Sequence, residues 1–167
     1  METIDLTLSV PNCWSMDIKL HLCESPDLRY EKIIHEFGGL SDQMVLRIVD
    51  VGERLSLETI EALDSGDEIR LEVDITQLSL IFQNCVRCNN CGAAKRYLRG
   101  GVSPNLRFGD DGVVADVATS VRMFKLLLKY GAQVRLMRSI YARIQRQEFE
   151  IVKLMLENGF KLNVDPH

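Results

Sequence analysis

The stretch Glu150-Ile151-Val152-Lys153-Leu154-Met155-Leu156-Glu157-Asn158-Gly159 decides the fold of the second half of the chain. Similar segments, residues 94–100 and 123–130, end at Gly101 and Gly131, and the three glycines are spaced by 30 and 28 residues. Each segment has the apolar spacing of a helix, which glycine ends before a short extended exit. A recurrence at this period predicts helical units that stack side by side.

These segments resemble the ankyrin repeat over residues 76–163, and the third copy, followed by Asn163, matches the family's second helix and its exit. The resemblance implies three first helices, at residues 78–84, 112–118 and 139–144. The family's Thr-Pro-Leu-His opening is missing, and residues 110–115 keep only its outline. Because the periods fall short of ~33 residues, we expect trimmed hairpin fingers. The expected core between the helices is Leu126, Leu127, Leu154 and Leu156.

The first half has the pattern of strands around one helix. Residues 4–10, 16–22 and 68–73 alternate apolar and polar side chains, which predicts strands with one buried face. Residues 45–49, Val-Leu-Arg-Ile-Val, are predicted to form a further strand. Ser25-Pro26 has the composition of a helix start, and Gly38-Gly39 that of a helix end. The predicted order is strand, strand, helix, strand, a short irregular or helical stretch over residues 55–63, and strand.

Residues 3–74 resemble the ubiquitin-like β-grasp family in this order of elements. The segments that carry the resemblance are residues 39–43, 52–55 and 57–60, and the turn Leu63-Asp64-Ser65-Gly66-Asp67 before the last strand. The chain continues as Asp74-Ile75-Thr76 in place of Gly-Gly, so the resemblance does not imply conjugation. It implies a recognition face on the sheet, for which Leu8, Val49 and Val51 are the nearest matches; we expect Leu8 and Val49 to be core residues instead. The predicted fold is therefore α+β, with a β-grasp domain over residues 1–74 and ankyrin-like repeats over residues 75–167.

Charge divides the chain at the same place. Residues 1–74 contain 6 Lys and Arg against 17 Asp and Glu, whereas residues 75–167 contain 14 against 7. A solvated surface explains the scattered acidic residues, but the basic half is equally consistent with attraction of a charged partner. We expect a partner protein with an acidic surface, bound by Arg107, Arg135, Arg138 and Arg143. Nucleic acid is the weaker alternative because the whole chain has a net charge of −4.

The cysteines suggest another alternative, a metal or redox site. Cys85, Cys88 and Cys91 have two C-x-x-C spacings, which suit zinc or an iron–sulfur cluster. A fourth ligand is missing nearby in the sequence, so we favour buried apolar roles for Cys85 and Cys88 and expect no bound metal. The odd number of cysteines indicates free thiols rather than a disulfide framework.

The sequence points to binding rather than catalysis. It contains no Ser/His/Asp spacing, no H-E-x-x-H motif and no glycine-rich phosphate loop, so no catalytic residue or cofactor is predicted. It has no apolar run of membrane-spanning length and no signal-like start, so we expect a cytoplasmic protein without a membrane partner. Eroded ankyrin-like repeats are common in viral and pathogen proteins, which suggests an adaptor that interferes with host proteins, in the host cytoplasm if viral. A β-grasp domain further implies contacts with ubiquitin-pathway or small-GTPase machinery.

Overall fold

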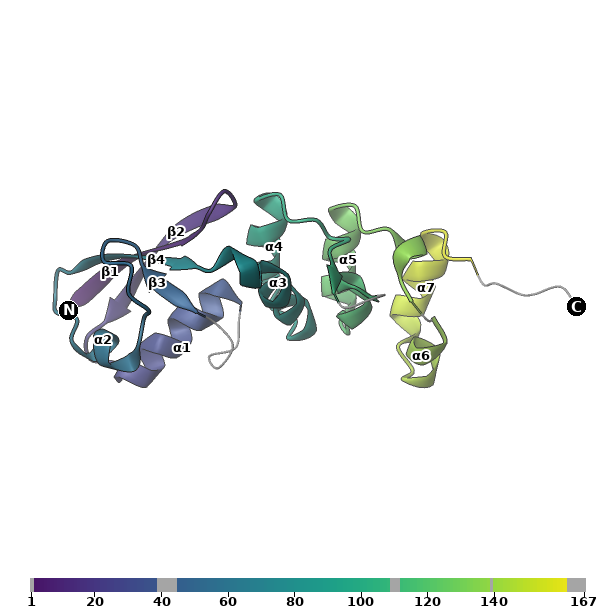
Figure 1. The fold of residues 1–167 in the computed structure, drawn as a ribbon. Helices are drawn as coiled ribbons and strands as arrows, with labels where there is room; N and C mark the ends of the chain where they lie inside the picture. Colours follow the sequence, from purple (N-terminus) through teal and green to yellow (C-terminus); the bar gives the residue numbers. More distant parts are fainter. Residues whose placement is uncertain (1, 39–44, 109–111, 139, 162–167) are drawn as a thin grey trace, which may run out of the picture.

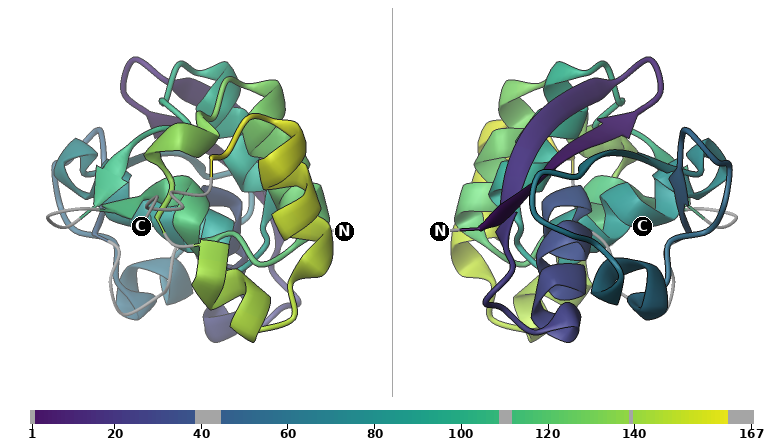
Figure 2. Two further views of the ribbon diagram at one scale, coloured as in Figure 1. Left: turned by 90° about the vertical axis from the view of Figure 1, so that its right-hand side faces the viewer. Right: turned by 90° about the vertical axis from the view of Figure 1, so that its left-hand side faces the viewer.

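A computed structural model of the 167 residues describes the chain except for residues 1, 39–44, 109–111, 139 and 162–167. The sheet lies at one end together with one long and one short helix, and the helices of the second half follow in a row toward the other end (Figure 1). The view along this row shows the helical part stacked behind the sheet (Figure 2). The predicted α+β class, with an N-terminal sheet followed by helices, is confirmed in this general form.

The described part of the first half forms a four-stranded sheet with the strand order β2-β1-β4-β3. The outer pairs β1–β2 and β3–β4 are antiparallel, whereas the central strands β1 and β4 are parallel, with Leu6 beside Ile69 and Leu8 beside Leu71. The parallel pair requires a crossover, which contains the long helix α1. The bounds are β1 Thr3–Val10, β2 Trp14–His21, α1 Pro26–Phe37, β3 Leu46–Ile48, α2 Leu57–Glu61 and β4 Glu68–Val73.

The inner face of the sheet is apolar because its strands alternate with a period of two. Ile4, Leu6 and Leu8 of β1 are at most 1% exposed. Helix α1 covers this face with Ile33, Ile34 and Phe37, which share one side at helical spacing. The Ser25 hydroxyl caps the helix by accepting a hydrogen bond from the amide of Leu28 at 3.3 Å.

The helix α1 ends at Gly38, as the sequence predicts, with a left-handed φ of 79°. Residues 39–43, which contribute to the β-grasp resemblance, lie outside the described residues.

The second half contains helix pairs in its first and third units. The first unit has α3 Leu78–Arg87, after the 3₁₀ turn η1 Ile75–Gln77, and α4 Cys91–Arg99. The third unit has α6 Ile140–Gln145 and α7 Phe149–Glu157. Between them, the chain forms a small hairpin of β5 Arg107–Phe108 and β6 Gly112–Val113. The second unit follows, with the 3₁₀ turn η2 Val114–Val117 and the helix α5 Val121–Lys129. The turn η3 Val134–Leu136 then leads to the third unit.

The predicted first helix of the second unit, residues 112–118, is therefore wrong. Gly112 and Val113 are paired in the hairpin, and only Val114–Val117 form a 3₁₀ turn. The β-branched residues Val113, Val114 and Val117 disfavour a helix. The predicted repeats also include residues 110, 111, 139 and 163, which lie outside the described part of the chain.

Glycine ends each second helix, as the recurrence predicts. Gly101, Gly131 and Gly159 have φ values of 99°, 96° and 90°. The amide of the next residue, as in Ala132, donates back to the last turn of its helix, here to the carbonyl oxygen of Leu127 at 2.9 Å. This left-handed position strains other residues, which explains why the three glycines recur.

The core of the helical part differs from the predicted leucine set at one position. Leu127 is fully buried, and Leu126 and Leu154 are partly buried against the core, but Leu156 is 46% exposed. The inward side of α7 instead bears Ile151 and Met155, four residues apart. Leu156 lies one residue further along the chain, about 100° around the helix, and therefore faces away from the core.

The sheet and the first unit are in direct contact through aromatic side chains. The ring of Trp14 lies 5.4 Å from that of Phe37 and 5.6 Å from that of Tyr97. Arg96 lies 5.3 Å over the Trp14 ring and forms a 2.9 Å ion pair with Glu36. A Cβ atom added to Gly100 would lie 2.5 Å from the carbonyl oxygen of Cys13, so the two parts approach as closely as glycine permits.

Candidate partner-binding surface

The loops that leave the first two units are joined by the side chain of Asn105. Its amide nitrogen donates to the carbonyl oxygen of Gly131 at 3.1 Å, and its oxygen accepts from the backbone amide of Gln133 at 2.8 Å. One side chain thus fixes the exit of the second unit against that of the first. The sequence analysis assigned no role to Asn105; the sequence signal for it is that Asn105 follows Gly101 by four residues, as Asn163 follows Gly159.

Asp116 joins the second unit to the third in the same manner. One carboxylate oxygen accepts from the amide of Val113 at 3.0 Å, and the other accepts from the amide of Arg138 at 2.8 Å. The sequence analysis missed Asp116, because no spacing in the chain marks it as a partner of Arg138.

Arg143 completes this junction from inside the protein. Its guanidinium donates to the carbonyl oxygens of Ala118, Ala115 and Asp116 at 2.6, 2.9 and 3.1 Å, and to Glu148 at 2.8 Å. It also lies 5.6 Å over the ring of Phe124 and is 3% exposed. The prediction that Arg143 contacts a partner is therefore wrong: its donors are used within the chain, where they fix η2 against the third unit.

The other three predicted residues lie on the loops that this framework holds. Arg107 is exposed in β5, Arg135 is exposed in η3, and Arg138 is exposed just after that turn. Arg135 donates from Nε to Gln133 at 2.9 Å and lines a shallow hollow of about 320 Å³ that extends to Gly159. We call Arg107, Arg135 and Arg138 the basic loop surface; it presents three cationic side chains on two adjoining loops.

The three clustered cysteines have different surroundings. Cys85 is fully buried, and its Sγ lies 3.4 Å from the carbonyl oxygen of Gly38, whereas Cys88 is exposed and Cys91 is partly buried. Burial raises the pKa of Cys85 to about 12, so its thiol is neutral near neutral pH. The apolar role predicted for Cys85 is confirmed, and that predicted for Cys88 is wrong. Among the described residues, no three His, Cys, Asp or Glu side chains are grouped as metal ligands.

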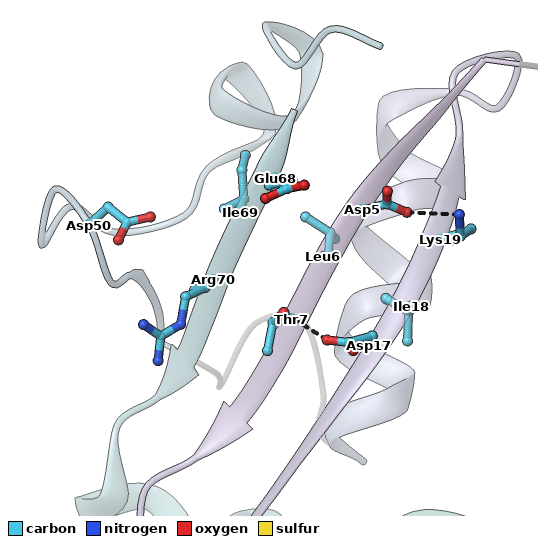
Figure 3. A pocket seen from close by; sticks show the side chains of 10 residues that line it. All are labelled: Asp5, Leu6, Thr7, Asp17, Ile18, Lys19, Asp50, Glu68, Ile69 and Arg70. Carbon is cyan, nitrogen blue, oxygen red and sulfur yellow. Dashed lines mark hydrogen bonds and ion pairs between the residues drawn. The ribbon is translucent and has the colours of Figure 1, made fainter. Parts of the chain in front are cut away.

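The outer face of the sheet, away from α1, is charged (Figure 3). Asp5 pairs with Lys19 at 3.3 Å, and the hydroxyl of Thr7 donates to Asp17 at 2.7 Å. Arg70 extends from β4 on the same face (Figure 3). This arrangement is a polar hollow rather than an apolar recognition patch.

The residues matched to the recognition face of the β-grasp family are dispersed. Leu8 is fully buried in the core, as predicted, while Val49 is partly buried and Val51 is 64% exposed. The three residues therefore do not form one exposed apolar face.

Comparisons with known proteins gave no match to a family model, a curated protein or a solved structure. Across the described residues, every helix falls short of the length and apolar character that a bilayer crossing requires.

Proposed function

We propose that this protein is a non-enzymatic interaction module, which binds the acidic surface of a partner protein through the basic loop surface. The proposal rests chiefly on one observation: Asn105, Asp116 and Arg143 fix the loops that present Arg107, Arg135 and Arg138. Loops held in place before binding lose less conformational entropy when a partner docks.

The fold supports a module of this kind. The strand order β2-β1-β4-β3 with a parallel central pair is consistent with a ubiquitin-like β-grasp domain. The glycine-ended helices and the hydrogen bonds between successive loops are consistent with shortened ankyrin-like repeats. Stacked repeats characteristically bind partners over an extended surface made by several units. We propose that the sheet domain covers the exposed side of the first unit.

Charge favours an acidic partner for this surface. Residues 75–167 have an excess of seven positive charges, 14 Lys and Arg against 7 Asp and Glu. Guanidinium groups donate to carboxylates in a planar, two-point geometry, and such complementary charges accelerate association and select the partner. The neighbouring sheet domain is acidic, with 6 basic against 17 acidic residues, so it would repel the same partner and restrict binding to the helical part.

The test is affinity capture by the purified chain, compared with a variant that combines Arg107→Glu, Arg135→Glu and Arg138→Glu. A matched control reverses the same number of charges on the exposed side of α5, through Arg122→Glu, Lys125→Glu and Lys129→Glu. Circular dichroism first establishes that both variants are folded.

We expect the loop variant to lose the captured partner and the α5 control to keep it. If both variants capture the same partner as the unchanged chain, the basic loop surface is not the binding site. Equal losses in both variants would indicate attraction by overall charge, which also contradicts the proposed site.

A further inference from the structure

The outward side of the last helix has the composition of a stacking surface. Phe149, Val152 and Leu156 of α7 occupy the positions that Val121, Phe124 and Leu128 occupy in α5, 28 residues earlier. The corresponding positions in α4, a further 30 residues back, are Cys91, Ala94 and Leu98. In α5 this side faces the next unit, since the guanidinium of Arg143, from the third unit, lies over the ring of Phe124.

Within the described part of the chain, the same positions are less buried in the third unit. Ala94 and Phe124 are fully buried and Leu98 is 5% exposed. In the third unit, Phe149 is 58% and Leu156 is 46% exposed, and Val152 is partly buried. On α6, Tyr141 is 61% and Ile144 is 40% exposed. We call Tyr141, Ile144, Phe149, Val152 and Leu156 the end face; the helices that bear it, α6 and α7, lie at the far end of the row of helices (Figure 1).

The charges beside the end face indicate what covers it. The positions next to the stacking residues are basic throughout α5, where they are Arg122, Lys125 and Lys129. In α7 the same positions are Glu150, Lys153 and Glu157, so the sign alternates along the helix. Glu150 and Lys153 lie at equal distances on either side of the midpoint between Ile151 and Val152. If a second α7 helix runs antiparallel to the first about that point, its Lys153 lies level with Glu150 of the first helix, and its Glu150 lies level with Lys153.

We propose that two copies of this chain associate through their end faces, with the two α7 helices antiparallel about a twofold axis at that midpoint. This inference does not depend on the proposed partner of the loops. An isologous contact places each flank of one helix against the same flank of the other. Glu150 of each copy then lies opposite Lys153 of the other, which gives two symmetric ion pairs beside the apolar contact.

The apolar flank fits the same axis. With a rise of 1.5 Å per residue, Phe149 of one copy falls about 3 Å along the axis from both Val152 and Leu156 of the other. It therefore inserts between these two side chains instead of meeting another Phe149, as a knob enters a hole. The contact is small, so we expect a reversible dimer with a micromolar to millimolar dissociation constant.

Sedimentation velocity of the full chain over a wide concentration range tests the proposal. Glu150→Lys alone places two lysines opposite each other, and Lys153→Glu alone places two glutamates opposite each other. We expect each single change to weaken dimerisation at least about tenfold. The double change restores opposite charges and should restore the dimer. An equimolar mixture of the two single variants should form heterodimers.

Matched controls are Lys125→Glu on α5 and Glu31→Lys on α1, both exposed, which make the same changes in net charge. We expect both controls to dimerise as the unchanged chain does. A chain that stays monomeric at the highest concentration would overturn the proposal. So would single reversals that dimerise normally, or a mixture of the two variants that does not associate.

Discussion

The hydroxyl of Tyr97 donates a 2.6 Å hydrogen bond to the carbonyl oxygen of Phe37, the last residue of α1. Tyr97 belongs to the first helical unit and is fully buried, so this bond ties the helical part to the sheet in the interior of their contact. Burial raises the pKa of Tyr97, which keeps the phenol protonated as a donor. The sheet and the first unit are therefore expected to unfold together.

Removing this hydroxyl tests that coupling. We expect Tyr97→Phe to lower the free energy of unfolding by about 1–2 kcal/mol, because the buried carbonyl of Phe37 loses its hydroxyl donor. Urea unfolding followed by Trp14 fluorescence and by helical circular dichroism provides the measurement. Tyr141→Phe, at a site that is 61% exposed, is the control and should change stability by less than about 0.5 kcal/mol. Separate midpoints for the two signals would contradict coupled unfolding.

Gly38, the residue after α1, packs against the helical part where a side chain has no room. It has a φ of 79°, and an added Cβ atom would lie 2.1 Å from the sulfur of Cys85. We expect Gly38→Ala to destabilise the protein by about 2–4 kcal/mol through steric overlap and backbone strain.

A matched glycine separates these two effects. Gly66 has a φ of 86° with no atom within 4 Å of an added Cβ, so Gly66→Ala should cost only about 1–2 kcal/mol of strain. In a Cys85→Ala background, Gly38→Ala should cost less than in the unchanged chain, because the overlapping sulfur is gone. An equal cost in both backgrounds would show that the sulfur contact does not matter.

Arg143 is predicted to be a stability residue. Arg143→Met leaves the carbonyl groups of Ala115 and Ala118 and the carboxylate of Glu148 without its donors, so we expect a loss of about 3–5 kcal/mol. Arg143→Lys should retain less than half of the stability that Arg143→Met loses, because one ammonium group cannot reach all of the acceptors that the guanidinium contacts. Arg146→Met, whose side chain is 56% exposed, should change unfolding by less than about 0.5 kcal/mol. The measurement is thermal unfolding, and equal losses of stability in Arg143→Met and Arg146→Met would contradict this role for Arg143.

The Cys85 thiol should make stability fall at alkaline pH. Burial raises its pKa from 9.0 to about 12 in the folded chain, so between these values the unfolded thiol ionises while the folded one stays neutral. This stability is fully present below pH 9.0 and is lost as the pH rises toward about 12. From about pH 8 to about pH 10, the stability difference between the unchanged chain and Cys85→Ala should shrink by ~1.4 kcal/mol. A constant difference would contradict the burial of a neutral thiol.

Local patterns predicted the elements that depend on neighbouring residues alone. The alternation in residues 68–73 predicted β4, and Ser25-Pro26 predicted the start of α1, because a capping hydroxyl and a fixed proline φ act within one turn. Gly101, Gly131 and Gly159 were predicted as helix ends, since a left-handed exit depends on the residue that occupies it.

The errors concern contacts between residues that are far apart in the sequence. Arg143 is a basic residue between Tyr141 and Ile144, and nothing near it shows that carbonyl groups from residues 115–118 converge on its guanidinium. Leu156 was assigned to the core because α7 carries apolar residues on more than one side, so its sequence does not fix which of them face inward. The direction of its buried side depends on how α7 packs on α5 and α6. The Arg143 junction and its effect on the basic loop surface therefore required the structure.

Hydrogen–deuterium exchange of the full chain, with and without the captured partner, tests the central claim most directly. We predict that the partner slows exchange at residues 105–108 and 133–138, and that exchange over β1, β2 and the exposed side of α5 stays unchanged. Protection confined to the sheet or to α5, with no change at the two loop segments, would contradict binding through the basic loop surface.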